Sequence, residues 1–220
     1  MGVGHLGVAL GAAKAAPRMN VGWLVFAALL ADFLLGIFAA MGLEHAQVPV
    51  DYASRHYLTF TFPYSHSLTT LLLWGVLFGL LVSWVQGGDQ RRVFVVVAAL
   101  VLSHFVLDGL VHVVGLPLAG ENSPKFGLAL WDHLPLELAL ETLMAAVGVA
   151  IYLTVAGSAP VFNRFGVLVV VFLLTALTWG QLFDNTPPVP SQLNFAWIAG
   201  PLLFGAALYG LDRKRALLAR

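Results

Sequence analysis

The sequence predicts an all-α, polytopic membrane protein with about six transmembrane helices and a short N-terminal half-helix. Of the 220 residues, 60% are hydrophobic and only 10% are charged. The mean hydropathy is +0.88, which is typical of a membrane protein rather than a soluble domain. Six apolar runs reach or approach the ~20 residues that a helix needs to cross a bilayer. They are residues 21–43, 65–85, 93–114, 134–156, 161–182 and 195–211.

We expect a single membrane domain over residues 1–220, with a polar site within residues 1–145 and scaffold helices in residues 146–220. Glycine- and proline-rich stretches separate the runs, as turns require. The last run contains Gly200-Pro201, which predicts a kink. The first run is too long for the apolar core of a cleavable signal peptide, and further spans follow it.

The charge and the cysteine content exclude several functions. The formal net charge is 0, so no basic face indicates nucleic-acid binding. The chain has no cysteine, which excludes disulfides, thiolate metal sites and cysteine nucleophiles. Any metal site would therefore use histidines and carboxylates.

The basic residues predict the orientation of the spans. With the N-terminal region in the cytoplasm, nine of the 11 lysines and arginines fall on the cytoplasmic side, and only Arg55 and Lys125 fall outside. This is a strong positive-inside bias. An even number of spans then places both terminal flanks in the cytoplasm.

Residue counting predicts that three polar side chains reach one depth. The apolar segment before Arg18 is too short to span a bilayer, so we expect it to fold back beside the first span. His5 lies 13 residues before Arg18, and Asp32 lies 14 residues after it. At ~1.5 Å per residue, both would lie about 20 Å from the cytoplasmic face. His104, 12 residues after Arg92, would lie at about 18 Å by the same rise.

The third run carries His104, Asp108 and His112 at four-residue intervals, so their side chains share one helix face. Ionisable groups are costly in hydrocarbon and are kept where they face a protein interior, a metal or a water-filled cavity. Two imidazoles and a carboxylate indicate metal binding or acid–base chemistry. The alternative is a polar network that only packs helices together.

Polar residues in the first two runs extend this pattern. Asp32 lies in the middle of the first run, where a carboxylate needs a cation or a proton, so it is either a metal ligand or a protonated, hydrogen-bonded side chain. Ser65, His66 and Ser67 open the second run. His66 is a candidate ligand or an interfacial residue. Ser65 and Ser67 are candidates for binding substrate or for orienting a ligand, although at least one of them is expected to cap the helix.

The fourth run begins with His133, Glu137 and Glu141, again four residues apart. Glu137 or Glu141 is a candidate general base, second-shell partner or ligand. His133 is interpreted as a residue at the outer edge of the span or as a second-shell group. Arg55 and His56, in the first outer loop, are candidates for substrate binding, although loop polarity explains them equally well.

The order of these motifs resembles the YdjM-type family of bacterial inner-membrane proteins, which are classed as metal-dependent hydrolases. The resemblance covers roughly residues 1–145 and implies a buried His/Asp metal site in a multi-pass protein of the inner membrane. Asp32 stands alone where many members have several acidic residues. The matching segments are His5-Leu6-Gly7, Asp32, Ser65-His66-Ser67, Ser103 to Asp108, Leu116-Pro117-Leu118 and Lys125 to Trp131.

We expect five metal ligands, with a sixth residue as a second choice. The five are His5, Asp32, His66, His104 and Asp108, and the sixth is His112. A set of nitrogen and oxygen donors suits Zn²⁺ best, with Mn²⁺ or Fe²⁺ as alternatives. A zinc-bound water with a pKa lowered toward ~7 would be the nucleophile.

The predicted function is metal-dependent hydrolysis in the outer half of the bilayer, on a lipid or a lipid-linked ester or phosphoester. Two other classes remain open. A non-catalytic subunit of a membrane complex would hold a structural metal in a closed four-ligand site and would bind a protein partner. A transporter or proton relay would need polar residues that continue into the cytoplasmic half. Membrane lipids are expected partners in each case.

Overall fold

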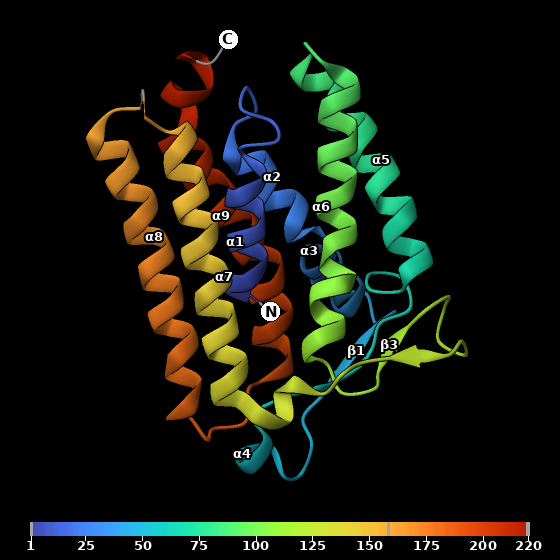
Figure 1. The fold of residues 1–220 in the computed structure, drawn as a ribbon. Helices are drawn as coiled ribbons and strands as arrows, with labels where there is room; N and C mark the ends of the chain where they lie inside the picture. Colours follow the sequence, from blue (N-terminus) through green and yellow to red (C-terminus); the bar gives the residue numbers. More distant parts are fainter. Residues whose placement is uncertain (1, 158, 219–220) are drawn as a thin grey trace.

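The computed structural model describes residues 2–157 and 159–218 and confirms the all-α, polytopic fold (Figure 1). Among these residues, five helices are long and apolar enough to cross a membrane, or six if the bent pair α2–α3 is one span. The helices are α1 (Gly2–Ala12), α2 (Val21–Ala28), α3 (Leu30–Ala40), α4 (Tyr52–Arg55), α5 (Leu68–Gln86), α6 (Gln90–Val111), α7 (Leu134–Val155), α8 (Val161–Trp179) and α9 (Pro190–Leu218). Short 3-10 turns lie at Leu130–His133 and Gly180–Leu182.

The two ends of the bundle differ. One end carries the C-terminus and the α1–α2, α5–α6 and α7–α8 connections, and we call it the basic end because Arg18, Arg92 and Arg213 lie there (Figure 1). The other, the hairpin end, carries α4 and two short antiparallel ladders. The strands are β1 (His45–Gln47), β2 (Thr59–Thr61), β3 (Leu116–Pro117) and β4 (Lys125–Phe126). The sequence analysis had placed only loops in these regions.

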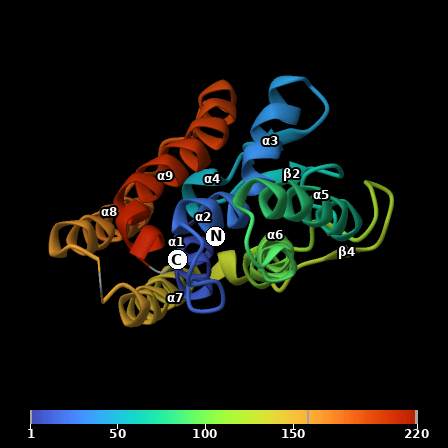
Figure 2. The ribbon, with the colours of Figure 1, turned by 90° about the horizontal axis from the view of Figure 1, so that it is seen from above.

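The N-terminal helix α1 folds back on α2, and this helical hairpin lies at the centre of the bundle (Figure 2). It packs against α6 on one side and against α7 and α9 on the other. Asn20 caps α2, because its side-chain oxygen accepts a hydrogen bond from the Gly22 N–H at 2.9 Å. The short N-terminal segment is therefore a buried half-helix.

Two glycines let α1 lie unusually close to α7. A Cβ atom added to Gly7 would lie 2.4 Å from the Met144 carbonyl oxygen, and one added to Gly148 would lie 2.0 Å from the Gly7 carbonyl oxygen. Small residues at helix interfaces in membranes permit this approach of two backbones. The contact fixes the height of α1 along α7.

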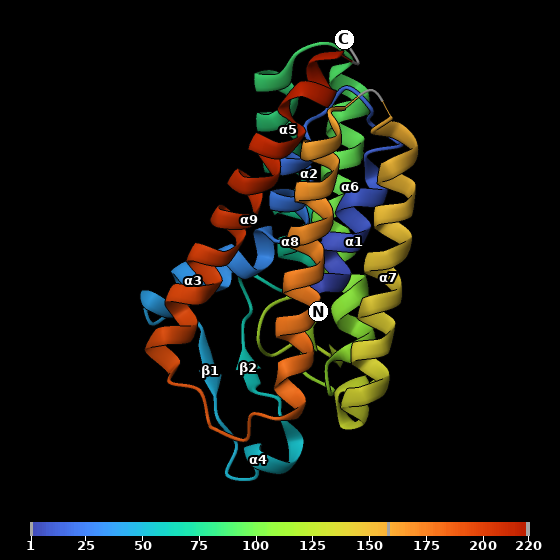
Figure 3. The same cartoon turned by 90° about the vertical axis from the view of Figure 1, so that its left-hand side faces the viewer.

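The first predicted span is broken. Helices α2 and α3 meet at Leu29 with a bend of 52°. Helix α9 is continuous and contains Pro201, and the kink at Gly200-Pro201 stays a prediction. The bend carries α3 away from the centre of the bundle and leaves Asp32 in its first turn (Figures 2 and 3).

The core between the basic end and the middle of the bundle is apolar. Leu10, Leu24, Val25, Val97 and Val101, from α1, α2 and α6, have no exposed surface. Toward the outside, α5 and α8 expose large apolar side chains. An apolar exterior around an apolar core is what a multi-pass membrane protein requires.

Candidate metal centre

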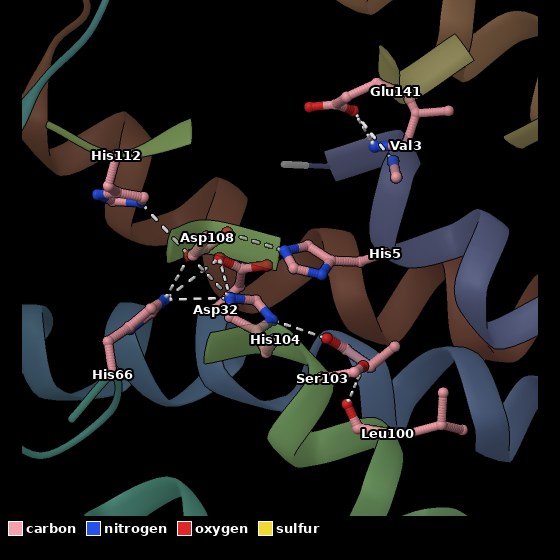
Figure 4. A network of polar contacts seen from close by, with 12 residues as sticks. Val3, His5, Asp32, His66, Leu100, Ser103, His104, Asp108, His112 and Glu141 are labelled. Atoms are coloured by element: carbon pink, nitrogen blue, oxygen red, sulfur yellow. Dashed lines mark hydrogen bonds and ion pairs between the residues drawn. The ribbon is translucent and has the colours of Figure 1, made fainter. Parts of the chain in front are cut away.

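Five side chains from four segments converge in the middle of the bundle (Figure 4). His5 comes from α1, Asp32 from α3, and His66 from the turn before α5, while His104 and Asp108 lie one turn apart on α6. Four of them are buried, and the Asp32 side chain is 26% exposed. They form two overlapping groups, His5–His104–Asp108 and Asp32–His66–His104, each with ligand atoms within 4.8 Å of one another.

Asp108 lies at the centre of the cluster. Its Oδ1 is 3.1 Å from His5 Nε2. Its Oδ2 is 3.3 Å from His104 Nε2 and 3.7 Å from His66 Nε2. The two carboxylate oxygens thus face imidazoles from three different segments of the chain.

His104 belongs to both groups. Its Nε2 lies 3.2 Å from His66 Nε2 and 3.8 Å from Asp32 Oδ1, and its ring stacks on His5 at 3.9 Å between centroids. Donors at ~2.0–2.2 Å from a tetrahedral ion are roughly 3.3 Å from one another. The spacing of the five donors therefore suits a metal ion with nitrogen and oxygen ligands.

A backbone carbonyl orients His104. Its Nδ1 lies 2.8 Å from the carbonyl oxygen of Ala28, at the end of α2. A carbonyl only accepts hydrogen bonds, so Nδ1 carries the proton in the neutral ring and Nε2 presents a lone pair. Such an outer partner is typical of a metal-ligating histidine.

A side-chain relay orients His66. Its Nδ1 lies 2.7 Å from Ser65 Oγ, which lies 2.6 Å from Glu44 Oε2. The ionised Glu44 carboxylate accepts, so the Ser65 hydroxyl donates to it and accepts the Nδ1 proton of His66. The Tyr64 and Ser65 N–H groups also donate to Glu44 Oε1, at 2.7 and 2.9 Å. Burial raises the pKa of the Glu44 carboxyl, and these hydrogen bonds act in the opposite direction.

These partners leave two imidazole lone pairs facing each other. When both rings are neutral with Nδ1 protonated, the 3.2 Å contact between His66 Nε2 and His104 Nε2 contains no hydrogen. The lone pairs and the nearby carboxylates of Asp32 and Asp108 together favour a cation between them. The residues present therefore fit a metal ion.

His112 lies beside the cluster rather than in either group of donors. It follows the last residue of α6, and its Nε2 is 3.3 Å from Asp108 Oδ2. Its ring centroid lies 4.0 Å from that of Trp131. His112 thus contacts Asp108, which is a candidate ligand, and Trp131 in the 3-10 turn Leu130–His133.

The two glutamates of α7 lie against the start of α1. Glu141 Oε2 accepts hydrogen bonds from the Val3 and Gly4 N–H groups, at 2.7 and 3.0 Å (Figure 4). These N–H groups belong to the first turn of a helix and have no partner within it, so Glu141 caps α1 from outside. Glu137 is hydrogen-bonded to Glu141.

The remaining candidates lie away from the five donors. Ser67 is the N-cap of α5 and accepts from the Thr70 N–H at 3.3 Å. His133 is exposed at the start of α7. Arg55 pairs with Asp51 at the hairpin end, beside His56.

Glu44 is the residue that the sequence analysis missed. Glu44 was not among the candidate residues of the sequence analysis. Its position directly after an apolar run is a weak signal, and nothing in the sequence links it to Ser65, 21 positions later.

The cluster forms one side of a cavity of about 350 Å³, which we call the central cavity. Asp32, His66, Asp108 and His112 line it, and apolar residues of α8 and α9 contribute the opposite wall. The volume lies within the ~300–1,000 Å³ range of small-molecule sites. The candidate metal centre is therefore accessible to a small molecule or to part of a larger one.

Comparisons with protein-family models, with curated proteins and with solved structures give no match to this chain.

Proposed function

We propose that this protein is a membrane-embedded, metal-dependent hydrolase that acts on a lipid or a lipid-linked ester or phosphoester. The observation that carries the proposal is the convergence of three histidines and two aspartates beside a cavity with apolar walls. A buried charged cluster of this kind is costly in a membrane and is typical of a functional site.

Zinc is the metal that we propose, because histidine and carboxylate donors without thiolates suit it, with manganese or iron as alternatives. When bound, such a metal would polarise an ester or phosphoester and lower the pKa of a coordinated water. Asp32, the most exposed donor, faces the central cavity, as does His112. The candidate proton acceptor is the pair of Glu137 and Glu141, whose carboxyl groups are hydrogen-bonded to each other.

The inner-membrane location rests on two observations. The predicted positive-inside bias puts the basic end in the cytoplasm and the hairpin end outside. The motif order resembles the YdjM-type inner-membrane proteins, which are classed as metal-dependent hydrolases. On this basis we propose a bacterial inner-membrane protein whose site lies in the outer half of the bilayer.

The alternatives are less well supported by the geometry. A structural metal in an accessory subunit would have a closed set of ligands, whereas three of the five donors, Asp32, His66 and Asp108, line a cavity. A transporter or proton relay would need a polar path to the basic end, but the buried side chains there on α1, α2 and α6, such as Leu24 and Val97, are apolar.

Metal analysis of the purified protein tests the proposal. We expect a bound transition metal in the unmodified chain and its loss in His104→Ala, because His104 belongs to both groups of donors. His133→Ala, which removes an exposed histidine outside the cluster, is the matched control and should retain the metal.

The metal-loaded protein should then release product from a lipid ester or phosphoester, and His104→Ala should not. A protein that binds no metal at any tested supply of zinc, manganese or iron would refute the proposal. So would equal metal content in the two histidine variants.

A further inference from the structure

A second space borders the central cavity on the side of the hairpin end. This hairpin-end hollow has a volume of about 430 Å³. The two spaces share five lining residues, which are Gly2, Phe60, Trp131, Thr178 and Trp197. The two spaces are therefore adjacent, and a molecule that spanned both would lie against the candidate metal centre.

The two helices that face the donors line both spaces in turn. Along α8, Leu174 lines the central cavity, Thr178 lines both spaces, and Gln181, just beyond the helix, lines the hollow. Steps of three or four residues keep these side chains on one face. On α9, Leu193 lines the hollow and Phe204 lines the cavity, so the passage follows both helices.

The lining changes in character along this passage. Apart from Thr178, the residues of α8 and α9 that line the central cavity are apolar, with Leu174, Pro201 and Phe204 among them. The hollow instead includes Arg55, His56, Gln181 and Glu137. The passage is thus polar at the hairpin end and apolar next to the candidate metal centre.

We propose that this passage holds an amphiphile with a single apolar chain, the chain in the central cavity and the polar head in the hairpin-end hollow. The inference rests on the proposed function, because it assigns the substrate class of the same site. The bond between head and chain would then lie at the boundary of the two spaces, which Trp131 lines on both sides. The Trp131 ring lies 4.0 Å from that of His112, whose Nε2 is 3.3 Å from Asp108 Oδ2.

Gly200 offers a way to fill the cavity without touching the donors. It lines the central cavity, and a Cβ atom added there would have only the Phe204 ring within 4 Å, at 3.6 Å. A leucine at this position would occupy the space assigned to the chain. Gly210 lies on the same helix with nothing within 4 Å of an added Cβ atom, so Gly210→Leu is the matched control.

The experiment titrates the full-length protein, in a membrane mimic, with butyl, hexyl and octyl phosphate and with inorganic phosphate. Each methylene moved from water into an apolar site strengthens binding about fourfold. We therefore expect affinity to rise with chain length in the unmodified protein and in Gly210→Leu. Gly200→Leu should lose at least tenfold in affinity for octyl phosphate and leave inorganic phosphate unchanged.

The inference is wrong if the affinity for alkyl phosphates rises equally with chain length in Gly200→Leu and Gly210→Leu. If Gly200→Leu does not fold, Thr178→Leu on the α8 wall replaces it, with the same expected loss. The two proposals fail separately. If the protein binds no metal but its affinity rises with alkyl chain length in the Gly200-dependent way, the hydrolase proposal is wrong and the passage is supported. If the protein binds metal but shows no such rise, the passage is wrong and the hydrolase proposal is kept.

Discussion

At the scale of single residues, the site depends on how two histidines are oriented as much as on which donors are present. His104 and His66 direct their Nε2 atoms into the cluster because their Nδ1 atoms are held by the Ala28 carbonyl and by Ser65. Glu44 in turn holds Ser65, with an oxygen–oxygen distance of 2.6 Å. A residue of the loop after α3 thereby fixes the tautomer of a candidate ligand on another segment.

Replacing Glu44 by glutamine should weaken metal binding. The amide of Glu44→Gln can donate to Ser65, whose hydroxyl can then donate to His66 Nδ1, which places the His66 proton on the Nε2 atom that faces the metal. Loss of an outer partner of this kind typically costs about 10–100-fold in metal affinity. Zinc titration of the purified variant against a competing chelator measures the change.

Glu121→Gln is the matched control, because Glu121 is a half-exposed glutamate that pairs with Lys125 at the hairpin end. Glu44→Asp, which keeps an acceptor, should bind more tightly than Glu44→Gln. Equal zinc affinity for Glu44→Gln and Glu121→Gln would show that the relay does not act on the metal.

At the scale of elements, the half-helix α1 delivers His5 to the cluster. Its position is set by two contacts with α7, which are the hydrogen bonds from Val3 and Gly4 to Glu141 and the close approach of Gly7 to Gly148. Neither contact involves a donor of the cluster. The height of His5 in the bundle is therefore decided by the α1–α7 interface.

Even a methyl group at position 148 should disturb the site. A Cβ atom there would lie 2.0 Å from the Gly7 carbonyl oxygen, so Gly148→Ala must push α1 away from α7 and move His5 from Asp108. Overpacking of this kind typically costs about 1–3 kcal/mol of stability. We expect a lower melting temperature and zinc affinity reduced at least tenfold.

Gly210→Ala is the control for the loss of a helical glycine, because its added Cβ atom meets no neighbour within 4 Å. If Gly148→Ala and Gly210→Ala bind zinc with equal affinity, the position of α1 does not affect metal binding at the site.

At the scale of the whole molecule, one buried ion pair joins the two ends of the chain at the basic end. Arg215 and Asp212 of α9 are 1% and 0% exposed. Arg215 donates to the carbonyl oxygens of Pro17 and Met19 in the α1–α2 turn, and Asp212 accepts from the Val21 N–H and the Tyr152 hydroxyl. The α1–α2 hairpin is thereby fixed to α7 and α9.

Removing the cation should destabilise the fold. Arg215→Met leaves the buried Asp212 carboxylate without its counter-ion, and breaking a buried pair typically costs about 3–5 kcal/mol. We expect a marked fall in the thermal unfolding temperature, and a smaller fall in the double variant Arg215→Met/Asp212→Leu, which buries no lone charge. Arg213→Met removes an exposed neighbour and should unfold like the unmodified chain.

Much of the fold could be predicted from the sequence because a bilayer imposes a simple length rule on apolar segments. The runs predicted for residues 134–156 and 161–182 match α7 (Leu134–Val155) and α8 (Val161–Trp179) closely. The bend at Leu29 was not predictable, because neither glycine nor proline marks it. The two short ladders were also missed, since strands of two or three residues carry little periodic signal.

The sequence by itself determined the membrane class and the stripe of His104, Asp108 and His112, because hydropathy and the four-residue step of a helix are local properties. Counting residues also placed His5 and Asp32 near the depth of His104. Only the tertiary structure decided that Asp108 lies at the centre of the cluster, with His112 beside it, and that Glu44 orients His66. It also brought α8 and α9 to the opposite wall of the cavity. Those relations depend on the packing of segments that lie far apart in the chain, and a single sequence records which side chains are present but not which of them meet.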